Sequence, residues 1–211
     1  MLSRTKRTFL ADIQALRLRI SREADQRNAR TIAIVGLWPS CGATTLSVWL
    51  ARSLAAEGHS TLLVDANTAR PALHKPWKLS AAPGINEIMS GNSDEEAAVR
   101  QVDIDGLQVL PLGAAPKPTK PNSNSSWNDG LASLSAEHKF ILVDAGTPEY
   151  TSTLEVAGAC DLTVAIAQAG TVRREAIKGR LALLGEHGAT TLGLILNKRH
   201  YSIPEFVYRR L

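Results

Sequence analysis

The chain has 211 residues, 44% of them hydrophobic and 21% charged, which is the balance of a globular protein with one domain-sized core. No apolar run approaches the ~18–20 residues that span a bilayer, and two cysteines are too few for a disulfide scaffold. The net charge of +4 lies at the ends, because residues 31–196 hold 12 Lys or Arg against 16 Asp or Glu. The net negative charge of residues 31–196 argues against a nucleic-acid-binding domain.

An amphipathic helix is predicted over residues 8–27. Its apolar residues recur at spacings of four, three and four, which places Phe9, Ile13, Leu16 and Ile20 on one helical face. Such a face usually packs on its own domain, although a partner or a second copy of the chain could also cover it.

Short apolar runs then alternate with helical segments along the chain. The predicted strands are Thr31–Val35, Thr61–Val64, Leu107–Leu110, Phe140–Val143, Leu162–Ile166 and Leu192–Leu196. The predicted helices are Ala43–Glu57 (ended by Gly58), Gly84–Met89, Asp94–Arg100, one that includes Leu131–Leu134, and Arg173–Leu184. The stretch Ala66–Ala82 is irregular, and Pro111–Ser126 is predicted as a loop. The alternation indicates an α/β fold, a parallel sheet with helices on both faces, whose ligands bind beyond the carboxyl ends of the strands.

Residues 36–45, Gly-Leu-Trp-Pro-Ser-Cys-Gly-Ala-Thr-Thr, follow a predicted strand and open a predicted helix, which is the context of a P-loop. Backbone N–H groups and the helix N-terminus form an anion site there, and Thr44 stands where a Mg²⁺-binding hydroxyl belongs. Ala43 replaces the lysine that stabilises charge on the transferred phosphate. Losing such a charge costs roughly two to three orders of magnitude in rate. Taken alone, a loop without this lysine is more often only a tight strand-to-helix turn. The motifs that follow in the sequence favour the P-loop interpretation instead.

Cys41 lies within the same loop, where the N–H groups could lower the pKa of its thiol. This position raises a redox-sensing hypothesis for Cys41.

The segment after the second predicted strand carries a family resemblance. It reads Leu62-Leu-Val-Asp65-Ala-Asn67-Thr-Ala-Arg70-Pro71-Ala-Leu-His74-Lys-Pro-Trp77, and it resembles the second Walker-type motif of bacterial tyrosine kinases of the polysaccharide co-polymerase system. These kinases are P-loop proteins related to the partitioning and septum-site ATPases. Further matches follow in the family's order, at Pro83–Gly91, Leu107–Gly113, Phe140–Pro148, Cys160–Glu175 and Gly193–Asn197. The resemblance spans roughly residues 31–200.

The resemblance implies a P-loop NTPase-type fold and a Mg-ATP site. It places Thr44 and Asp144 on the Mg²⁺ positions, Asp65 on the catalytic base or metal carboxylate, and Asn197 on the adenine contact. The implied nucleotide-binding residues are Gly36, Gly42, Ala43, Thr44, Thr45, Arg70 and Asn197.

Several departures from the family pattern point to a degenerate member. Ala43 replaces the lysine, Asn67 replaces a second aspartate, and the tyrosine-rich C-terminal segment of the family has no counterpart here. The family's oligomerisation motif is reduced to Arg17 in the stretch Ala11-x-x-Gln14-x-x-Arg17, so ring assembly by that route is not expected.

Three parts are therefore predicted: a basic amphipathic helix at 1–30, a P-loop kinase-like domain at 31–200, and a basic tail at 201–211. We expect a cytoplasmic protein that docks on a membrane polysaccharide co-polymerase at the inner face of the plasma membrane. Its role would lie in biosynthesis or export of a capsule, exopolysaccharide or adhesin. The basic ends are either solvated or meet an acidic partner or an anionic membrane surface. A homo-oligomer is compatible with the sequence, and no nucleic-acid partner is expected.

Two alternatives remain at this point. The first is a weakly active Mg-ATP-dependent tyrosine autokinase or ATPase, because metal charge and positioning carry most of phosphoryl transfer and Arg70 could replace the lysine in part. The second is a positioning ATPase of the partitioning type, which ranks last because Gly36–Gly42 contains no lysine.

Overall fold

The computed structural model describes residues 4–114 and 127–198, so the predicted tail 201–211 and residues 115–126 of the predicted loop lie outside it. The helices, in chain order, are α1 (Arg4–Arg27), α2 (Ala43–Ala56), α3 (Ile85–Met89), α4 (Glu95–Ala98), α5 (Trp127–Leu134), α6 (Thr151–Ala159) and α7 (Arg174–Glu186). The strands are β1 (Thr31–Gly36), β2 (Thr61–Asp65), β3 (Arg100–Gln101), β4 (Leu107–Leu110), β5 (Phe140–Gly146), β6 (Leu162–Gln168) and β7 (Thr191–Asn197).

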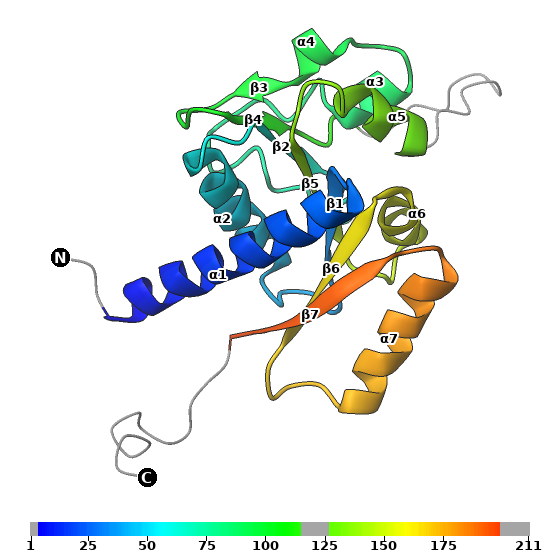
Figure 1. Cartoon of the computed structure of the whole chain (residues 1–211). Coiled ribbons are helices and arrows are strands. Elements are labelled where there is room, and N and C mark those ends of the chain that lie inside the picture. Colours follow the sequence, from blue (N-terminus) through cyan, green and yellow to red (C-terminus); the bar gives the residue numbers. More distant parts are fainter. Residues whose placement is uncertain (1–3, 115–126, 199–211) are drawn as a thin grey trace.

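The strands form one sheet in the order β3-β4-β2-β5-β1-β6-β7 (Figure 1). Every neighbouring pair is parallel except β3 and β4. Helices α1 and α2 contribute to the core on one face, and α3 to α7 contribute to the core on the other. The predicted α/β fold with helices on both faces is thereby confirmed.

The central strands explain why the apolar runs are so uninterrupted. Strands β1, β2 and β5 are buried at every position, because each lies between two strands and two helical layers. Strand β7 lies at the sheet edge, and its Leu194 and Leu196 are 36% and 54% exposed. Its apolar run therefore does not reflect burial on both faces, unlike the runs of β1, β2 and β5.

Strand β3 was not predicted, because its residues fall at the end of the predicted helix Asp94–Arg100. The Asp94 carboxylate caps α4 by accepting a hydrogen bond from the Ala97 N–H at 2.8 Å. The helix ends at Ala98 because Val99 takes up an extended conformation. Antiparallel pairing of β3 with β4 follows, a long-range contact that no local pattern indicates.

Helix α6 was also missed by the sequence analysis. Tyr150 stands at its N-cap and provides no side-chain hydrogen bond, so the usual capping signal is absent. The helix forms through tertiary contacts instead. Leu154, Val156 and Ala157 are buried, and the Thr153 hydroxyl donates to the Ala145 carbonyl at 2.7 Å.

Helix α1 packs on its own domain, as its apolar stripe predicted. Ile13 and Ile20 are 3% and 1% exposed, and Phe9 meets the ring of Trp49 on α2 edge-on at 5.5 Å. The side chain of Arg17 is almost buried and pairs with Glu57 at 3.0 Å, an intramolecular contact. Among the described residues, no helix has both the length and the hydropathy to cross a bilayer.

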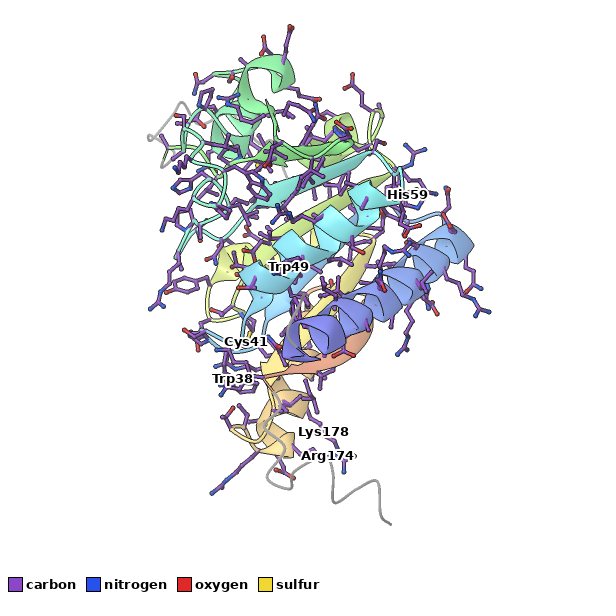
Figure 2. All side chains as sticks on the ribbon, turned by 90° about the vertical axis from the view of Figure 1, so that its left-hand side faces the viewer. Trp38, Cys41, Trp49, His59, Arg174 and Lys178 are labelled. Atoms are coloured by element: carbon purple, nitrogen blue, oxygen red, sulfur yellow. The ribbon has the colours of Figure 1, made fainter. Side chains whose placement is uncertain are left out.

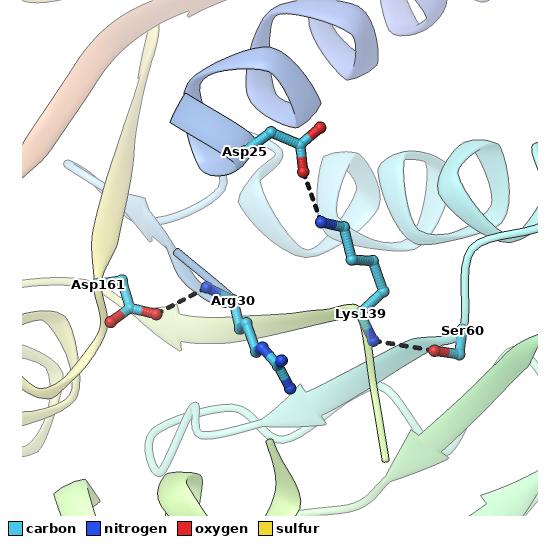
Figure 3. A network of polar contacts seen from close by, with 5 residues as sticks. All are labelled: Asp25, Arg30, Ser60, Lys139 and Asp161. Carbon is cyan, nitrogen blue, oxygen red and sulfur yellow. Dashed lines mark hydrogen bonds and ion pairs between the residues drawn. The ribbon is translucent and has the colours of Figure 1, made fainter. Parts of the chain in front are cut away.

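A polar network ties the amino ends of the strands together (Figure 3). One oxygen of Asp161 accepts three hydrogen bonds at 2.8 Å, from the Arg30 N–H, the Thr31 N–H and the Thr31 hydroxyl. The Lys139 N–H donates to the Ser60 hydroxyl, while its ammonium group pairs with Asp25 at the end of α1. Burial alone would raise the pKa of Asp161, but the hydrogen bonds from Thr31 and Arg30 outweigh it and lower that pKa.

We predict that Asp161→Ala lowers the free energy of unfolding by about 1–2 kcal/mol at pH 7, because three donors lose a charged acceptor at a site that water can partly reach. Since folding lowers this pKa below 3.8, the stabilisation is present above that pH and disappears as pH falls through the folded-state pKa. Urea unfolding at pH 7 and at successively lower pH measures this effect. The difference in the free energy of unfolding between Asp161→Ala and the wild type should become smaller as the pH falls.

Asp25→Ala is the matched control, because it removes a solvent-exposed ion pair with Lys139. Its cost should stay below about 1 kcal/mol. Equal losses from Asp161→Ala and Asp25→Ala at pH 7 would contradict the role given to Asp161.

Candidate functional site

A cavity of about 400 Å³ opens at the carboxyl end of the sheet, the edge at which parallel sheets bind ligands. The structure gathers most of the predicted site residues around it, namely Gly36, Gly42, Ala43, Thr44, Thr45, Arg70 and Asp144. Asp65 and Asn197 are not among the lining residues.

The loop between β1 and α2 forms one wall of this cavity. Gly42 holds a left-handed backbone at φ +97°, and no side chain caps the start of α2. An uncapped helix N-terminus next to a glycine is suited to receive an anion. Gly36 is also required, since a Cβ there would lie 2.8 Å from the Cys41 Sγ.

Position 43 supplies no positive charge to the loop. Ala43 occupies the first turn of α2 and is only 9% exposed. A phosphate bound here would therefore meet backbone N–H groups of the loop but no lysine from it.

Asp144 is the most unusual group of the site. It is 1% exposed, and neither carboxylate oxygen accepts a hydrogen bond of normal geometry. Burial raises its pKa to about 7. The Thr44 hydroxyl and the Gly146 N–H lie near enough to oppose this effect in part, and the Asp65 carboxylate adds to it. A buried, unpartnered carboxylate next to a hydroxyl fits a hard cation such as Mg²⁺.

The donor set matches what Mg²⁺ usually takes from a P-loop protein. In the part of the chain that the structure describes, no three His, Cys, Asp or Glu side chains gather to hold a metal by themselves. Thr44 and Asp144 would hold the ion, with water and phosphate oxygens supplying the other ligands. When bound, the ion would neutralise phosphate charge.

Asp65 has a different environment. It lies beside Asp144 in the register of β2 and β5, but it is fully buried and its oxygens accept hydrogen bonds from the N–H groups of Asn67, Ala72 and Leu73 at 2.9–3.1 Å. These contacts favour a role in holding the loop after β2. A role as catalytic base or metal carboxylate stays a prediction.

The loop after β2 also contributes Asn67 and Arg70. The Asn67 side-chain oxygen accepts a hydrogen bond from the Arg70 N–H at 3.1 Å, which shapes the turn. The Arg70 side chain is exposed and lines the cavity, and its contact with a nucleotide stays a prediction.

Asn197 contacts the phosphate loop itself. Its side-chain amide donates to the Cys41 carbonyl at 2.9 Å, and a Cβ at Gly42 would collide with that amide. The adenine contact implied by the family stays a prediction, and the observed role of Asn197 is to brace the loop.

Arg180 and Glu149 were missed by the sequence analysis, because their positions near the phosphate loop depend on tertiary contacts. The Arg180 guanidinium on α7 lies 4.3 Å from the centre of the Trp38 ring, and it donates to the Leu37 carbonyl and to Glu149. This side chain thus joins the loop after β1 to the loop after β5. Figure 2 shows Trp38 and Cys41 near one end of α2, with His59 at the other end.

The hypothesis of an acidic, redox-active Cys41 is wrong in its premise. The thiol is 2% exposed. Burial raises its pKa, and the N–H groups of Ala43 and Trp38 only partly oppose this effect. A buried thiol with a raised pKa is a poor nucleophile.

Comparisons with known proteins agree with this geometry. The family model described as "Cellulose biosynthesis protein BcsQ" matches residues 29–180. Tyrosine-protein kinase CpsD of Streptococcus agalactiae is 29% identical over 182 residues, covering 84% of this chain and 79% of CpsD.

Solved structures share the fold. The kinase domain of Escherichia coli tyrosine kinase ETK aligns with a TM-score of 0.79 at 20% identity, covering 91% of this chain and 77% of that chain. The septum site-determining protein MinD of Pyrococcus horikoshii, complexed with Mg-ADP, aligns with a TM-score of 0.66 at 19% identity, covering 86% and 76%. The predicted P-loop NTPase-type fold is therefore confirmed.

We predict that Asp144→Asn stabilises the protein in metal-free buffer. Because folding raises the pKa of Asp144 from 3.8 to about 7, the charged carboxylate destabilises the fold above pH 4, increasingly up to about pH 7 and constantly beyond. The gain at pH 8 should be up to about 4 kcal/mol and should vanish near pH 4. Urea unfolding in EDTA at the two pH values measures it.

Asp65→Asn provides the comparison variant. Burial raises the pKa of Asp65 as well, but the N–H groups of Leu73, Ala72 and Asn67 oppose this effect, and an amide can accept only part of their hydrogen bonds. Asp65→Asn should therefore gain less stability at pH 8 than Asp144→Asn. Equal changes in the two variants, or a loss of stability in Asp144→Asn, would refute the account of an uncompensated charge at Asp144.

Proposed function

This chain belongs to the P-loop family of cellulose biosynthesis protein BcsQ and the bacterial tyrosine kinases, and we propose that it is a nucleotide-binding regulator with a weakened kinase site. It acts in the biosynthesis or export of an extracellular polysaccharide. It docks on a membrane polysaccharide co-polymerase from the cytoplasmic side and is peripheral to the plasma membrane.

One observation carries this proposal: the site retains what binds Mg-nucleotide but lacks the lysine that assists transfer. The uncapped N-terminus of α2, the unpartnered Asp144 and the neighbouring Thr44 are all present. Because position 43 is an alanine, the phosphate loop has no positively charged side chain of its own. Nucleotide binding depends on the first set, whereas rapid phosphoryl transfer also needs the missing charge.

The names of the relatives support the choice of process. The family model is named for cellulose biosynthesis, which supports a role with an extracellular polysaccharide, whether a capsule, an exopolysaccharide or an adhesin. The relative CpsD is named a tyrosine-protein kinase, and the loss of the lysine distinguishes this chain from a fully active member.

Exposed basic side chains support docking at an acidic surface. Arg19 and Arg22 on α1 face solvent. Arg174 and Lys178 on α7 do so as well (Figure 2). They fit the acidic cytosolic segment of a co-polymerase next to an anionic membrane. A second copy of the chain would have to use a surface other than Arg17, which is engaged with Glu57.

A weakly active Mg-ATP-dependent tyrosine autokinase or ATPase is the second candidate. The observation that favours it is the pairing of Thr44 with Asp144 at the cavity, since positioning and metal charge carry most of phosphoryl transfer. Arg70 at the cavity wall would supply part of the missing charge.

Equilibrium binding of Mg-ADP and Mg-ATP tests the nucleotide site. Calorimetry, together with Trp38 fluorescence, should show micromolar binding to the wild type that falls at least about tenfold in both Thr44→Ala and Asp144→Ala. Cys160→Ala is the control, because Cys160 lies outside the cavity. Absence of binding at millimolar nucleotide would reduce the loop to a strand-to-helix turn.

Introducing a lysine at position 43 tests whether the protein is a regulator or a weakly active enzyme. We predict that Ala43→Lys raises the rate of ATP hydrolysis or autophosphorylation by about 10²-fold, because it supplies the charge on the transferred phosphate. Ala43→Met, a neutral side chain of similar length, should not. A wild-type rate that Ala43→Lys does not increase, and that Asp144→Asn abolishes, would favour the enzyme.

A further inference from the structure

The residues at the carboxyl end of β7 contact the phosphate loop. Sheet order places β7 beside β6, and β6 beside β1, which leads into the loop. Asn197 donates to the Cys41 carbonyl. The next residue, Lys198, donates from its ammonium group to the Ser40 carbonyl at 2.6 Å.

Lys198 is one of two basic side chains among the described residues that line the cavity, the other being Arg70. The two belong to the loops after β7 and after β2. Arg180 lies nearby, but its guanidinium already serves the Leu37 carbonyl, Glu149 and the Trp38 ring. Among the residues that the structure describes, Lys198 is the basic side chain of the cavity that contacts the phosphate loop, and no carboxylate of these residues forms an ion pair with it.

We propose that Lys198 supplies, from β7, the phosphate-binding positive charge that Ala43 no longer provides. The inference rests on the proposed nucleotide site and names the residue that binds its phosphates. An ammonium group has three donors, and the bond to Ser40 uses one of them, which leaves two for phosphate oxygens. Its flexible stem lets the group follow the ligand without moving the backbone.

The backbone at Lys198 supports this placement. Its φ of +55° is in the left-handed region, where a lysine gains nothing by itself. From this position the Lys198 ammonium group contacts the Ser40 carbonyl, so the side chain lies against the phosphate loop.

A purely mechanical function for Lys198 is the competing explanation, in which the ammonium group only holds the loop through Ser40. Lys198→Gln separates the two, because a glutamine amide can still donate to the Ser40 carbonyl but carries no charge. Lys198→Arg keeps the charge. Lys178→Gln is the matched control, since Lys178 is an exposed lysine on α7 that does not line the cavity (Figure 2).

Calorimetric titration with Mg-ADP at low and high salt tests the proposal on the full chain. We expect Lys198→Gln to weaken binding about tenfold or more and to reduce its salt dependence. The Kd of Lys198→Arg for Mg-ADP should stay within about threefold of the wild-type value. The control Lys178→Gln should bind Mg-ADP as tightly as the wild type does. Thermal unfolding of all variants should coincide, because the Lys198 side chain is exposed.

The double variant Ala43→Lys/Lys198→Gln provides a second readout. If Lys198 stands in for the missing loop lysine, Lys198→Gln should weaken binding much less when position 43 already carries a lysine. Undiminished Mg-ADP binding by Lys198→Gln would overturn the inference and leave the nucleotide site intact. Failure of the wild type to bind Mg-ADP would overturn both.

Discussion

The parallel pairing of β1 with β5 on one side and with β6 on the other is the constraint on which the site depends. It brings the loop after β1 next to Asp144, and through β6 it brings the end of β7 to the same edge. The register of β1 and β5 shifts between Ile34 and Val35, and bulges of this kind often aim a side chain at a functional site. No single segment contains the cavity; the sheet assembles it.

Two polar groups of the site, the Asp144 carboxylate and the N-terminus of α2, have unsatisfied hydrogen-bonding capacity. Asp144 is buried and neither of its oxygens accepts a hydrogen bond of normal geometry, while no side chain caps the start of α2. Each feature costs stability in the free protein, and a cation with a bound phosphate would satisfy both. The polar network at the opposite edge, around Asp161, shows the contrast, because there a carboxylate accepts three hydrogen bonds and its pKa falls. Stability is concentrated at one end of the strands and ligand chemistry at the other.

Loss of a loop lysine need not end the use of a P-loop, because the backbone supplies most of the anion cradle. What changes is which part of the fold delivers positive charge. In this chain Arg70 and Lys198 approach from the loops after β2 and β7, so charge would come from the cavity walls rather than from the loop. Such an arrangement suits binding better than transfer, and this difference is what separates a regulator from a kinase.

The sequence by itself determined the buried strands, the long helices and the positions of Ala43, Thr44 and Asp144, because apolar periodicity and motif order are local properties. It did not determine β3, which exists only through pairing with β4, or α6, which lacks a capping signal and forms by packing. The tertiary structure also decided that Asp65 holds a loop, that the Cys41 thiol is buried, and that Lys198 reaches Ser40. The loop held by Asp65 depends on how the segment after β2 folds back onto that carboxylate, through hydrogen bonds from residues up to eight positions away. The contact of Lys198 with Ser40 joins residues 158 positions apart, which become neighbours only when the sheet forms.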